Sequence, residues 1–209
     1  MKTIYIFFLL LTAKPICALV ENYSINDIET FKLKSVEGKF YTKENLKGKF
    51  GTIIIFLSNH CKVSKKFQDY IISMYNILEE KGIKLFVISP NFEKAILPDE
   101  LAYTDSGDSF EEMKERANWK KYNFPFIYDG EKQIITKSLN VKITPTAYLF
   151  NKFGKLIYSG RLGNHDKPFE IENSELYQAV KRLLIGDFQY VRTKVFGTSI
   201  RFQEDMKLV

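Results

Sequence analysis

Two apolar runs separated by an amphipathic segment restrict the fold of this chain more than any other feature. The first run holds four consecutive β-branched residues, Thr52 to Ile55, which is typical of a central strand covered on both faces. From Val63 to Gly82 apolar side chains recur at the spacing of one helical face, and residues 83–89 form a second apolar run. A strand, a helix and a strand in this order require a right-handed crossover between parallel strands. The pattern therefore predicts an α/β fold.

The other segments fit into the same single domain. Residues 31–42 alternate apolar and polar positions around Glu37-Gly38, which predicts an N-terminal hairpin. The remaining expected elements are a loop at 90–107, an inserted helix at 108–122 capped by Asp108 or Ser109, a short strand at 124–130, a short helix at 131–141, a hairpin at 144–161 and a last helix from Asn173 or Ser174 to Gly186. This order predicts a mixed central sheet with helices on both faces.

The first 18 residues have the pattern of a signal peptide. Lys2 precedes an apolar run, and Ile16 and Ala18 occupy the −3 and −1 positions of a cleavage site. An uncleaved anchor stays open as an alternative, although the run is short for a membrane span. We therefore expect an exported protein, periplasmic or secreted, with no membrane span after cleavage. The expected parts are the signal peptide (1–18), a lead segment (19–30), the domain (31–188) and a C-terminal tail that packs on the domain (189–209).

Removal of the signal peptide would change both the charge and the cysteine count. The formal net charge is +6, and the loss of Lys2 and Lys14 (6 minus 2) would leave +4. Basic and acidic residues are interspersed without a basic block, so we expect no nucleic-acid partner. Cys17 would also be lost, which would leave Cys61 as the one cysteine of the mature chain. A single cysteine cannot form an internal disulfide.

Cys61 lies at the expected junction of a strand and a helix, which favours a reactive thiol. Unpaired backbone N–H groups at a helix N-terminus stabilise an anion, and the thiolate is the form that attacks disulfides and peroxides. Lys62, Lys65 and Lys66 add positive charge nearby, and His60 offers a hydrogen-bond donor or a proton shuttle. Structural roles stay open for both residues, as a small buried side chain for Cys61 and as a loop contact for His60.

Short motifs along the chain carry a family resemblance. Residues 58–62 read Ser-Asn-His-Cys-Lys, where one redoxin branch has Cys-Asn-His-Cys-Pro after its first core strand. Further matches follow in order: Ser-Pro-Asn at 89–91, FPFIYD at 124–129, TPTAYLF at 144–150, YSGRLGNH at 158–165 and FGTSIRF at 196–202. On these motifs the chain resembles the alkyl hydroperoxide reductase / thiol-specific antioxidant superfamily. The resemblance implies a thioredoxin-like fold.

The resemblance also implies a role for Cys61 and the loss of its usual partners. Cys61 aligns with the attacking thiol of thioredoxin-like and peroxiredoxin-like proteins. Ser58 and Thr198 stand where the family has cysteines, and Lys62 replaces the proline of the motif. Ser64 stands where a two-cysteine oxidoreductase holds its resolving thiol. The chain therefore lacks the cysteines that would regenerate Cys61 internally.

A substrate-binding loop is implied at Thr144-Pro145. In thioredoxin-like proteins the equivalent proline is cis, and its loop faces the thiol with a backbone edge that pairs with an extended substrate. Arg161 would steady an anion near this pocket, with a surface or tail-packing role as the alternative. Ser58 occupies the place of the threonine that holds peroxide in peroxidases, but Ile54 stands where that signature begins with proline.

These features favour an exported thiol oxidoreductase or peroxiredoxin-like antioxidant protein that uses Cys61 alone. A peroxide or a protein disulfide would oxidise the thiol, and an external thiol or thioredoxin-like reductant would regenerate it. The alternative is a redox-inactive thioredoxin-fold binding protein. A copper-handling site of His60, Cys61 and His165 is a third interpretation, but their spacing matches no zinc pattern. We expect no resident metal and no cofactor.

Overall fold

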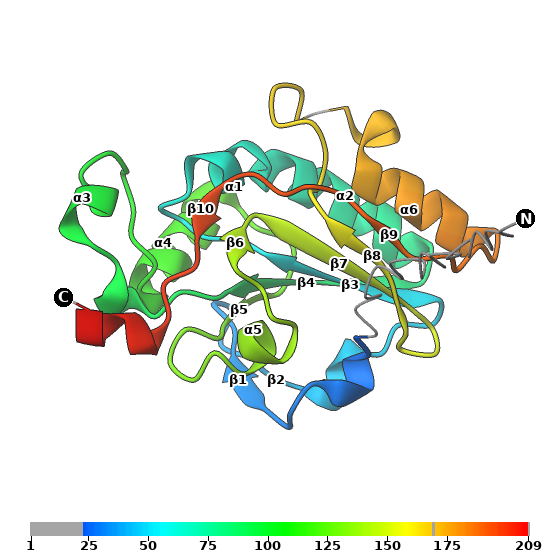
Figure 1. The fold of residues 1–209 in the computed structure, drawn as a ribbon. Coiled ribbons are helices and arrows are strands. Elements are labelled where there is room, and N and C mark those ends of the chain that lie inside the picture. Colours follow the sequence, from blue (N-terminus) through cyan, green and yellow to red (C-terminus); the bar gives the residue numbers. More distant parts are fainter. Residues whose placement is uncertain (1–22, 169, 209) are drawn as a thin grey trace, which may run out of the picture.

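The computed structural model describes residues 23–168 and 170–208, which fold around one central sheet (Figure 1). The expected signal peptide and Cys17 lie outside these residues. In the described part of the chain, none of the helices has the length and apolar character needed to cross a bilayer.

A mixed sheet of six strands, counted over the described residues, forms the centre of the molecule in the order β5-β4-β3-β7-β8-β9. Its strands are β3 (Gly51–Phe56), β4 (Ile83–Ser89), β5 (Phe126–Tyr128), β7 (Thr146–Asn151), β8 (Leu156–Gly160) and β9 (Val191–Arg192). Strand β3 pairs in parallel with β4 and antiparallel with β7, and it is buried along its whole length. The predicted mixed sheet is confirmed.

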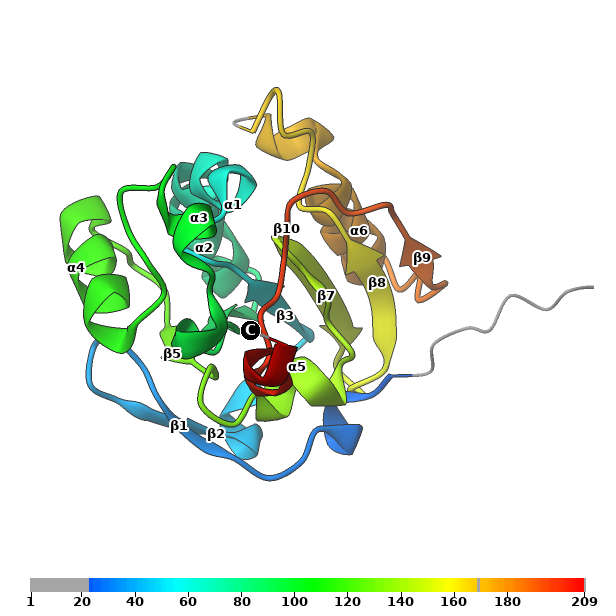
Figure 2. The ribbon, with the colours of Figure 1, turned by 60° about the vertical axis from the view of Figure 1, so that its left-hand side comes forward.

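Helices cover both faces of this sheet, as predicted (Figure 2). They are α1 (Lys62–Lys66), α2 (Gln68–Glu80), α3 (Pro98–Leu101), α4 (Phe110–Lys120), α5 (Ile134–Ser138) and α6 (Glu175–Leu184), with 3-10 turns at Ile25–Asp27, Lys43–Leu46, Glu93–Ala95, Ile171–Asn173 and Gln203–Leu208. Because side chains alternate along a strand, Ile53 and Ile55 pack with side chains of α2, α4 and α6. Ile54 and Phe56 pack on the other face, with α5 and the N-terminal segment.

The single helix expected from Val63 to Gly82 is wrong, because α1 and α2 are separated by a break at Phe67. The Phe67 N–H donates to the Ser64 carbonyl at 3.1 Å, which tightens this turn to an i to i−3 contact. The Phe67 ring is buried and meets the Tyr70 ring edge to face, with 5.8 Å between the centroids. We attribute the break to burial of this ring, which the apolar spacing does not reveal.

The loop expected at 90–107 contains two short helical segments. A 3-10 turn covers Glu93–Ala95, and α3 follows from Pro98 to Leu101. Proline suits the first turn of a helix because its missing N–H would have no helical partner there. The prediction of a loop is therefore wrong for these residues.

Both ends of the described chain pack onto the domain. Ile25 and Ile28 are buried in the second face of the core although they precede the expected domain start at residue 31. The predicted hairpin is present as β1 (Lys32–Lys34) and β2 (Phe40–Thr42). After α6 the chain returns across the sheet, where β9 joins β8 and β10 (Thr198–Ser199) pairs antiparallel with β6 (Ile143–Thr144) (Figure 1).

A buried carboxyl beyond β5 makes the stability of this fold depend on pH. Asp129 accepts hydrogen bonds from the N–H and the Oγ1 of Thr136, at 2.8 and 2.7 Å. Burial nevertheless raises the pKa of Asp129 from 3.8 to about 6. The folded protein therefore binds more protons than the unfolded chain between these two values, so the stabilisation is present at pH 4 and is lost as the pH rises through 6.

The variant Asp129→Asn isolates this effect. The difference in unfolding free energy, wild type minus variant, is expected to fall by about 1–3 kcal/mol between pH 4 and pH 7. Urea unfolding at both pH values measures this difference, in which the other carboxyl groups cancel. Equal differences at the two pH values would contradict the expectation.

Candidate active site

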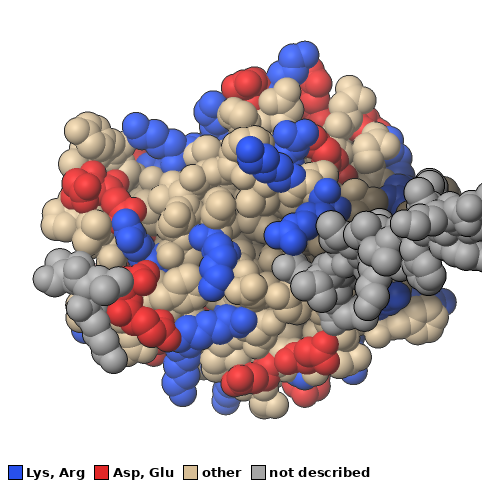
Figure 3. Space-filling view, viewed as in Figure 1, with Lys and Arg blue, Asp and Glu red and all other residues tan. Residues whose placement is uncertain are grey.

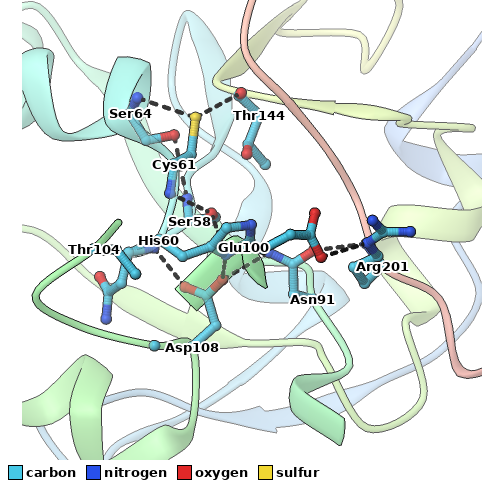
Figure 4. A network of polar contacts seen from close by, with 12 residues as sticks. Ser58, His60, Cys61, Ser64, Asn91, Glu100, Thr104, Asp108, Thr144 and Arg201 are labelled. Carbon is cyan, nitrogen blue, oxygen red and sulfur yellow. Dashed lines mark hydrogen bonds and ion pairs between the residues drawn. The ribbon is translucent and has the colours of Figure 1, made fainter. Parts of the chain in front are cut away.

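Cys61 lies between β3 and α1, where it is the N-cap residue of α1 (Figure 4). Its sulfur takes the place of the usual capping oxygen, because Sγ accepts a hydrogen bond from the Ser64 N–H at 3.4 Å. On the other side the thiol donates to the Thr144 carbonyl at 3.1 Å. The thiol is 0% exposed. It is thus held between the first turn of α1 and the loop that leads into β7.

The Thr144–Pro145 peptide is cis, as the resemblance implies. The Thr144 carbonyl that accepts the Cys61 thiol belongs to this peptide unit. The chain therefore brings together two elements that are 83 residues apart in sequence, the candidate thiol and the candidate substrate loop.

Ser58 holds the loop that carries Cys61. Its Oγ accepts a hydrogen bond from the Cys61 N–H at 3.2 Å and lies 3.2 Å from the Nδ1 of His60. Its N–H donates to the Oγ of Ser64 at 3.4 Å. Ser58 is 0% exposed, so its hydroxyl is engaged inside the protein.

Asp108 completes the site, although no sequence pattern had marked it as a functional residue. Its carboxylate accepts from the Asn59 N–H at 2.5 Å, from the His60 Nδ1 at 2.5 Å and from the Asn91 Nδ2 at 2.8 Å. All three side chains of this His-Asp-Asn network are buried. Asp108 thereby orients the His60 ring and fixes the backbone next to Cys61.

Asp108 is one of the two residues that the sequence offered as the cap of α4, and the structure decides between them. Ser109, not Asp108, caps α4, because the Ser109 Oγ accepts from the Glu112 N–H at 3.3 Å. An acidic residue next to a serine that already suffices as a cap is a signal for a second role. The Ser-Pro-Asn motif at 89–91, quoted for the resemblance, contains the Asn91 that binds it.

Two lysines beside Cys61 have contacts of their own. Lys65 donates to the Thr104 Oγ1 at 2.6 Å and forms an ion pair with Asp105. The hydrogen bond that Lys65 donates to Asp105 holds the pKa of the Asp105 carboxyl below its usual value. Lys62 lies over the Tyr103 ring, 5.5 Å from its centroid. Part of the positive charge expected at the thiol is therefore offset.

Arg161 and His165 also have partners outside the loop of Cys61. The Nε of Arg161 donates to the Glu175 Oε1 at 2.6 Å, so a carboxylate of α6 balances its charge. His165 lies 3.6 Å from the Asp166 carboxylate and contacts the Phe196 ring. Within residues 23–168 and 170–208, no three His, Cys, Asp or Glu side chains form a group that could hold a metal ion.

The C-terminal tail joins the same network (Figure 4). The Arg201 N–H donates to the Asn91 Oδ1 at 2.8 Å, and its guanidinium pairs with Glu100 at 2.8 Å. Although burial acts to raise it, the pKa of Glu100 is held below its ordinary value by the hydrogen bond from Arg201. Hydrogen bonds thus connect the tail through Asn91 and Asp108 to the Cys61 loop.

The chain is similar to solved structures over most of its length. An uncharacterized conserved protein from Geobacillus kaustophilus is 26% identical, with a TM-score of 0.69 over 87% of this chain and 92% of that one. A hypothetical protein from Sinorhizobium meliloti is 20% identical, with a TM-score of 0.70 over 84% and 92%. The thioredoxin domain of a thiol-disulfide oxidoreductase from Bacteroides vulgatus is 16% identical, with a TM-score of 0.54 over 78% and 98%. These likenesses support the thioredoxin-like fold.

Sequence comparisons give the family. The thiol-disulfide oxidoreductase ResA from Bacillus anthracis is 26% identical over 127 residues, which are 61% of this chain and 63% of that protein. The chain thus spans 63% of the length of the curated relative. The model of the AhpC/TSA family matches residues 26–159, more than half of the chain and the whole segment from the N-terminal hairpin through Cys61 and Pro145. On this match the chain belongs to the AhpC/TSA family.

Proposed function

We propose that this protein is a thiol-disulfide oxidoreductase in which Cys61 is the single reacting cysteine. The observation that carries the proposal is the contact of its thiol with both the Ser64 N–H and the carbonyl of the cis Thr144–Pro145 peptide. The first is a donor that stabilises a thiolate, and the second belongs to the loop where an extended substrate would lie. The similarity to ResA supports the same reaction class.

In the proposed reaction the Cys61 thiolate attacks one sulfur of a protein disulfide. The Cys61–S bond forms as the disulfide bond breaks, and the departing thiolate takes up a proton from solvent. The result is a mixed disulfide on Cys61. The thiolate of an external thiol or of a thioredoxin-like reductant then attacks the substrate sulfur of this bond. A disulfide forms between the reductant and the substrate as the bond to Cys61 breaks, and Cys61 leaves as the thiolate. A second reductant thiol attacks the reductant sulfur of that disulfide and releases the reduced substrate.

We propose an external reductant because Cys61 is the one cysteine among the described residues, and its thiol is not in a disulfide. Ser64 stands at the resolving position and has a hydroxyl, which cannot form a disulfide. Ser58, His60 and Asp108 are assigned a positioning role, since they hold the loop of Cys61. Ser58 occupies the place of the residue that holds peroxide in peroxidases, but its hydroxyl is buried and accepts a hydrogen bond from the Cys61 N–H. We therefore prefer disulfide chemistry to peroxide chemistry.

We further propose that the protein works outside the cytoplasm. The support is the signal-peptide pattern of residues 1–18, and disulfide exchange suits an oxidising compartment.

The variant Cys61→Ser is expected to abolish catalysis of disulfide reduction. The assay follows reduction of a protein disulfide by a small dithiol, and the variant should return the rate to that of the dithiol alone because serine cannot form a mixed disulfide. Cys17→Ser is the matched control and should keep the rate. Equal rates for wild type and Cys61→Ser would instead favour the redox-inactive binding protein.

A further inference from the structure

A segment of the C-terminal tail crosses the loop that faces Cys61. Strand β10 pairs antiparallel with β6, the strand that contains Thr144 (Figure 1). The two backbones approach so closely that a Cβ atom on Gly197 would lie 1.9 Å from the Thr144 carbonyl oxygen. We call residues 196–199 the strap. It occupies the backbone edge next to the candidate thiol.

We propose that the β6 edge beneath the strap is the binding surface for an extended, acidic segment of a protein partner, and that the strap covers this edge until the partner replaces it. The inference rests on the proposed function. The thiol of Cys61 is 0% exposed and donates to the Thr144 carbonyl, the same carbonyl against which Gly197 of the strap lies. A strand edge whose own covering strand is released can accept a strand from another chain.

The strap is held more weakly than the segment that follows it. Phe196 is 43% exposed, and its ring contacts His165 at 6.1 Å between centroids. By contrast, Ile200 is 4% exposed and its N–H donates to the Lys142 carbonyl at 2.8 Å. The Arg201 carbonyl accepts two further hydrogen bonds, from Phe92 and Gln133. Because the contacts are concentrated beyond residue 199, the strap can open locally while its C-terminal anchor stays in place.

The charge beside the β6 edge indicates the chemistry of the partner. A cavity of about 590 Å³ lies between β6, β7, β8 and the segment before the strap. Lys142 and Lys194 line it, and no carboxylate is among its described lining residues. Figure 3 shows Lys and Arg side chains across the middle of this face, with acidic side chains mostly towards its edges. A partner segment with Asp or Glu next to its disulfide would complement this charge.

The variant Gly197→Ala tests the strap, because its new methyl group would collide with the Thr144 carbonyl and lift the strap. Alkylation of Cys61 by iodoacetamide, a neutral reagent, is expected to accelerate by more than about tenfold in the native full chain. Mass spectrometry of the peptide that contains Cys61 gives the rate. The matched control is Gly38→Ala, a turn position with a φ of 85° and no atom within 4 Å of its Cβ, which should keep the wild-type rate.

Two model peptide disulfides, one with Asp and Glu flanks and one with Lys flanks, test the partner. The acidic peptide should form the mixed disulfide on Cys61 faster, and the difference should shrink at high salt. Equal rates would overturn the acidic partner. An unchanged alkylation rate in Gly197→Ala, with mixed disulfide still formed, would overturn the strap and leave the proposed function standing. If Gly197→Ala is alkylated faster but neither peptide forms a mixed disulfide, the proposed function is wrong and the strap remains a cover of the thiol.

A measurement on the unaltered chain keeps the test valid if Gly197→Ala folds poorly. Local opening of the strap exposes little surface, so the alkylation rate of wild-type Cys61 should be flat at urea concentrations where the fold is intact. A rate that rises with urea in step with global unfolding would overturn the strap, because the thiol would then be reached only through the unfolded chain.

Discussion

Replacing Asp108 with alanine is expected to lower the free energy of unfolding by about 3–5 kcal/mol. The Asp108 carboxylate accepts hydrogen bonds from the Asn59 N–H, the His60 Nδ1 and the Asn91 Nδ2. Asp108 itself is 1% exposed and Asn59 and Asn91 are 0% exposed, so water cannot readily replace the lost acceptor. The Asn59 N–H and the Asn91 Nδ2 would remain unpaired, each at a cost of about 1–3 kcal/mol if it does not relax, whereas the His60 Nδ1 would keep the Ser58 Oγ at 3.2 Å. Urea unfolding of the wild type and the variant measures the loss.

Two further variants test whether this loss comes from the missing hydrogen-bond acceptor. Asp108→Asn keeps the volume and one acceptor oxygen, so an intermediate loss is expected. Asp166→Ala removes an exposed carboxylate and should change the unfolding free energy by no more than about 0.5 kcal/mol. A loss below about 1 kcal/mol for Asp108→Ala would contradict the account, because removal of the shared acceptor from a buried network should cost more free energy than this.

Introducing a second thiol by Ser64→Cys is expected to change the product of oxidation completely. Ser64 is three residues after Cys61, and its N–H already contacts the sulfur at 3.4 Å. In the first turn of a helix this spacing falls within the roughly 4.4–6.8 Å between Cα atoms that a disulfide requires. After treatment with oxidised glutathione, the wild type should retain glutathione on Cys61. The variant should lose the adduct and form an internal disulfide, because the introduced thiol attacks at high effective concentration.

The measurement is the mass of the peptide that contains Cys61 after oxidation and quenching. The variant should carry at least about tenfold less adduct than the wild type. Ser73→Cys adds an equally new thiol on an exposed position of α2 and should leave the adduct on Cys61 in place. An adduct that persists in Ser64→Cys would mean that position 64 is not a resolving position in this fold.

Local sequence patterns were sufficient for the elements that build the sheet. The β-branched run of β3 and the apolar spacing of α2 predicted a buried strand and a helix because each pattern reflects burial of that element alone. They also placed Cys61 at the start of a helix. The break at Phe67 was missed, since an aromatic ring that turns into the core keeps the same spacing as one on a continuous helix.

The contacts that complete the site were not predictable in this way. Asp108 lies 48 residues from His60, and a residue pattern does not state which distant donors will surround a carboxylate. The strap was missed for a related reason. Strands β6 and β10 have two residues each, too few to show any alternation, and their pairing depends on where the tail crosses the sheet. The resemblance anticipated a backbone edge at Thr144 but gave no sign that the chain itself covers it.

The most direct test of the proposed function is the formation of a mixed disulfide on Cys61 in the folded protein. The full chain is mixed with a peptide disulfide without denaturant, quenched with acid, and the peptide that contains Cys61 is analysed by mass spectrometry. We predict one peptide adduct on Cys61, released again by an added thiol. A Cys61 that stays unmodified in the folded protein, even in Gly197→Ala, and reacts only in denaturant would contradict the proposal and leave a redox-inactive binding protein.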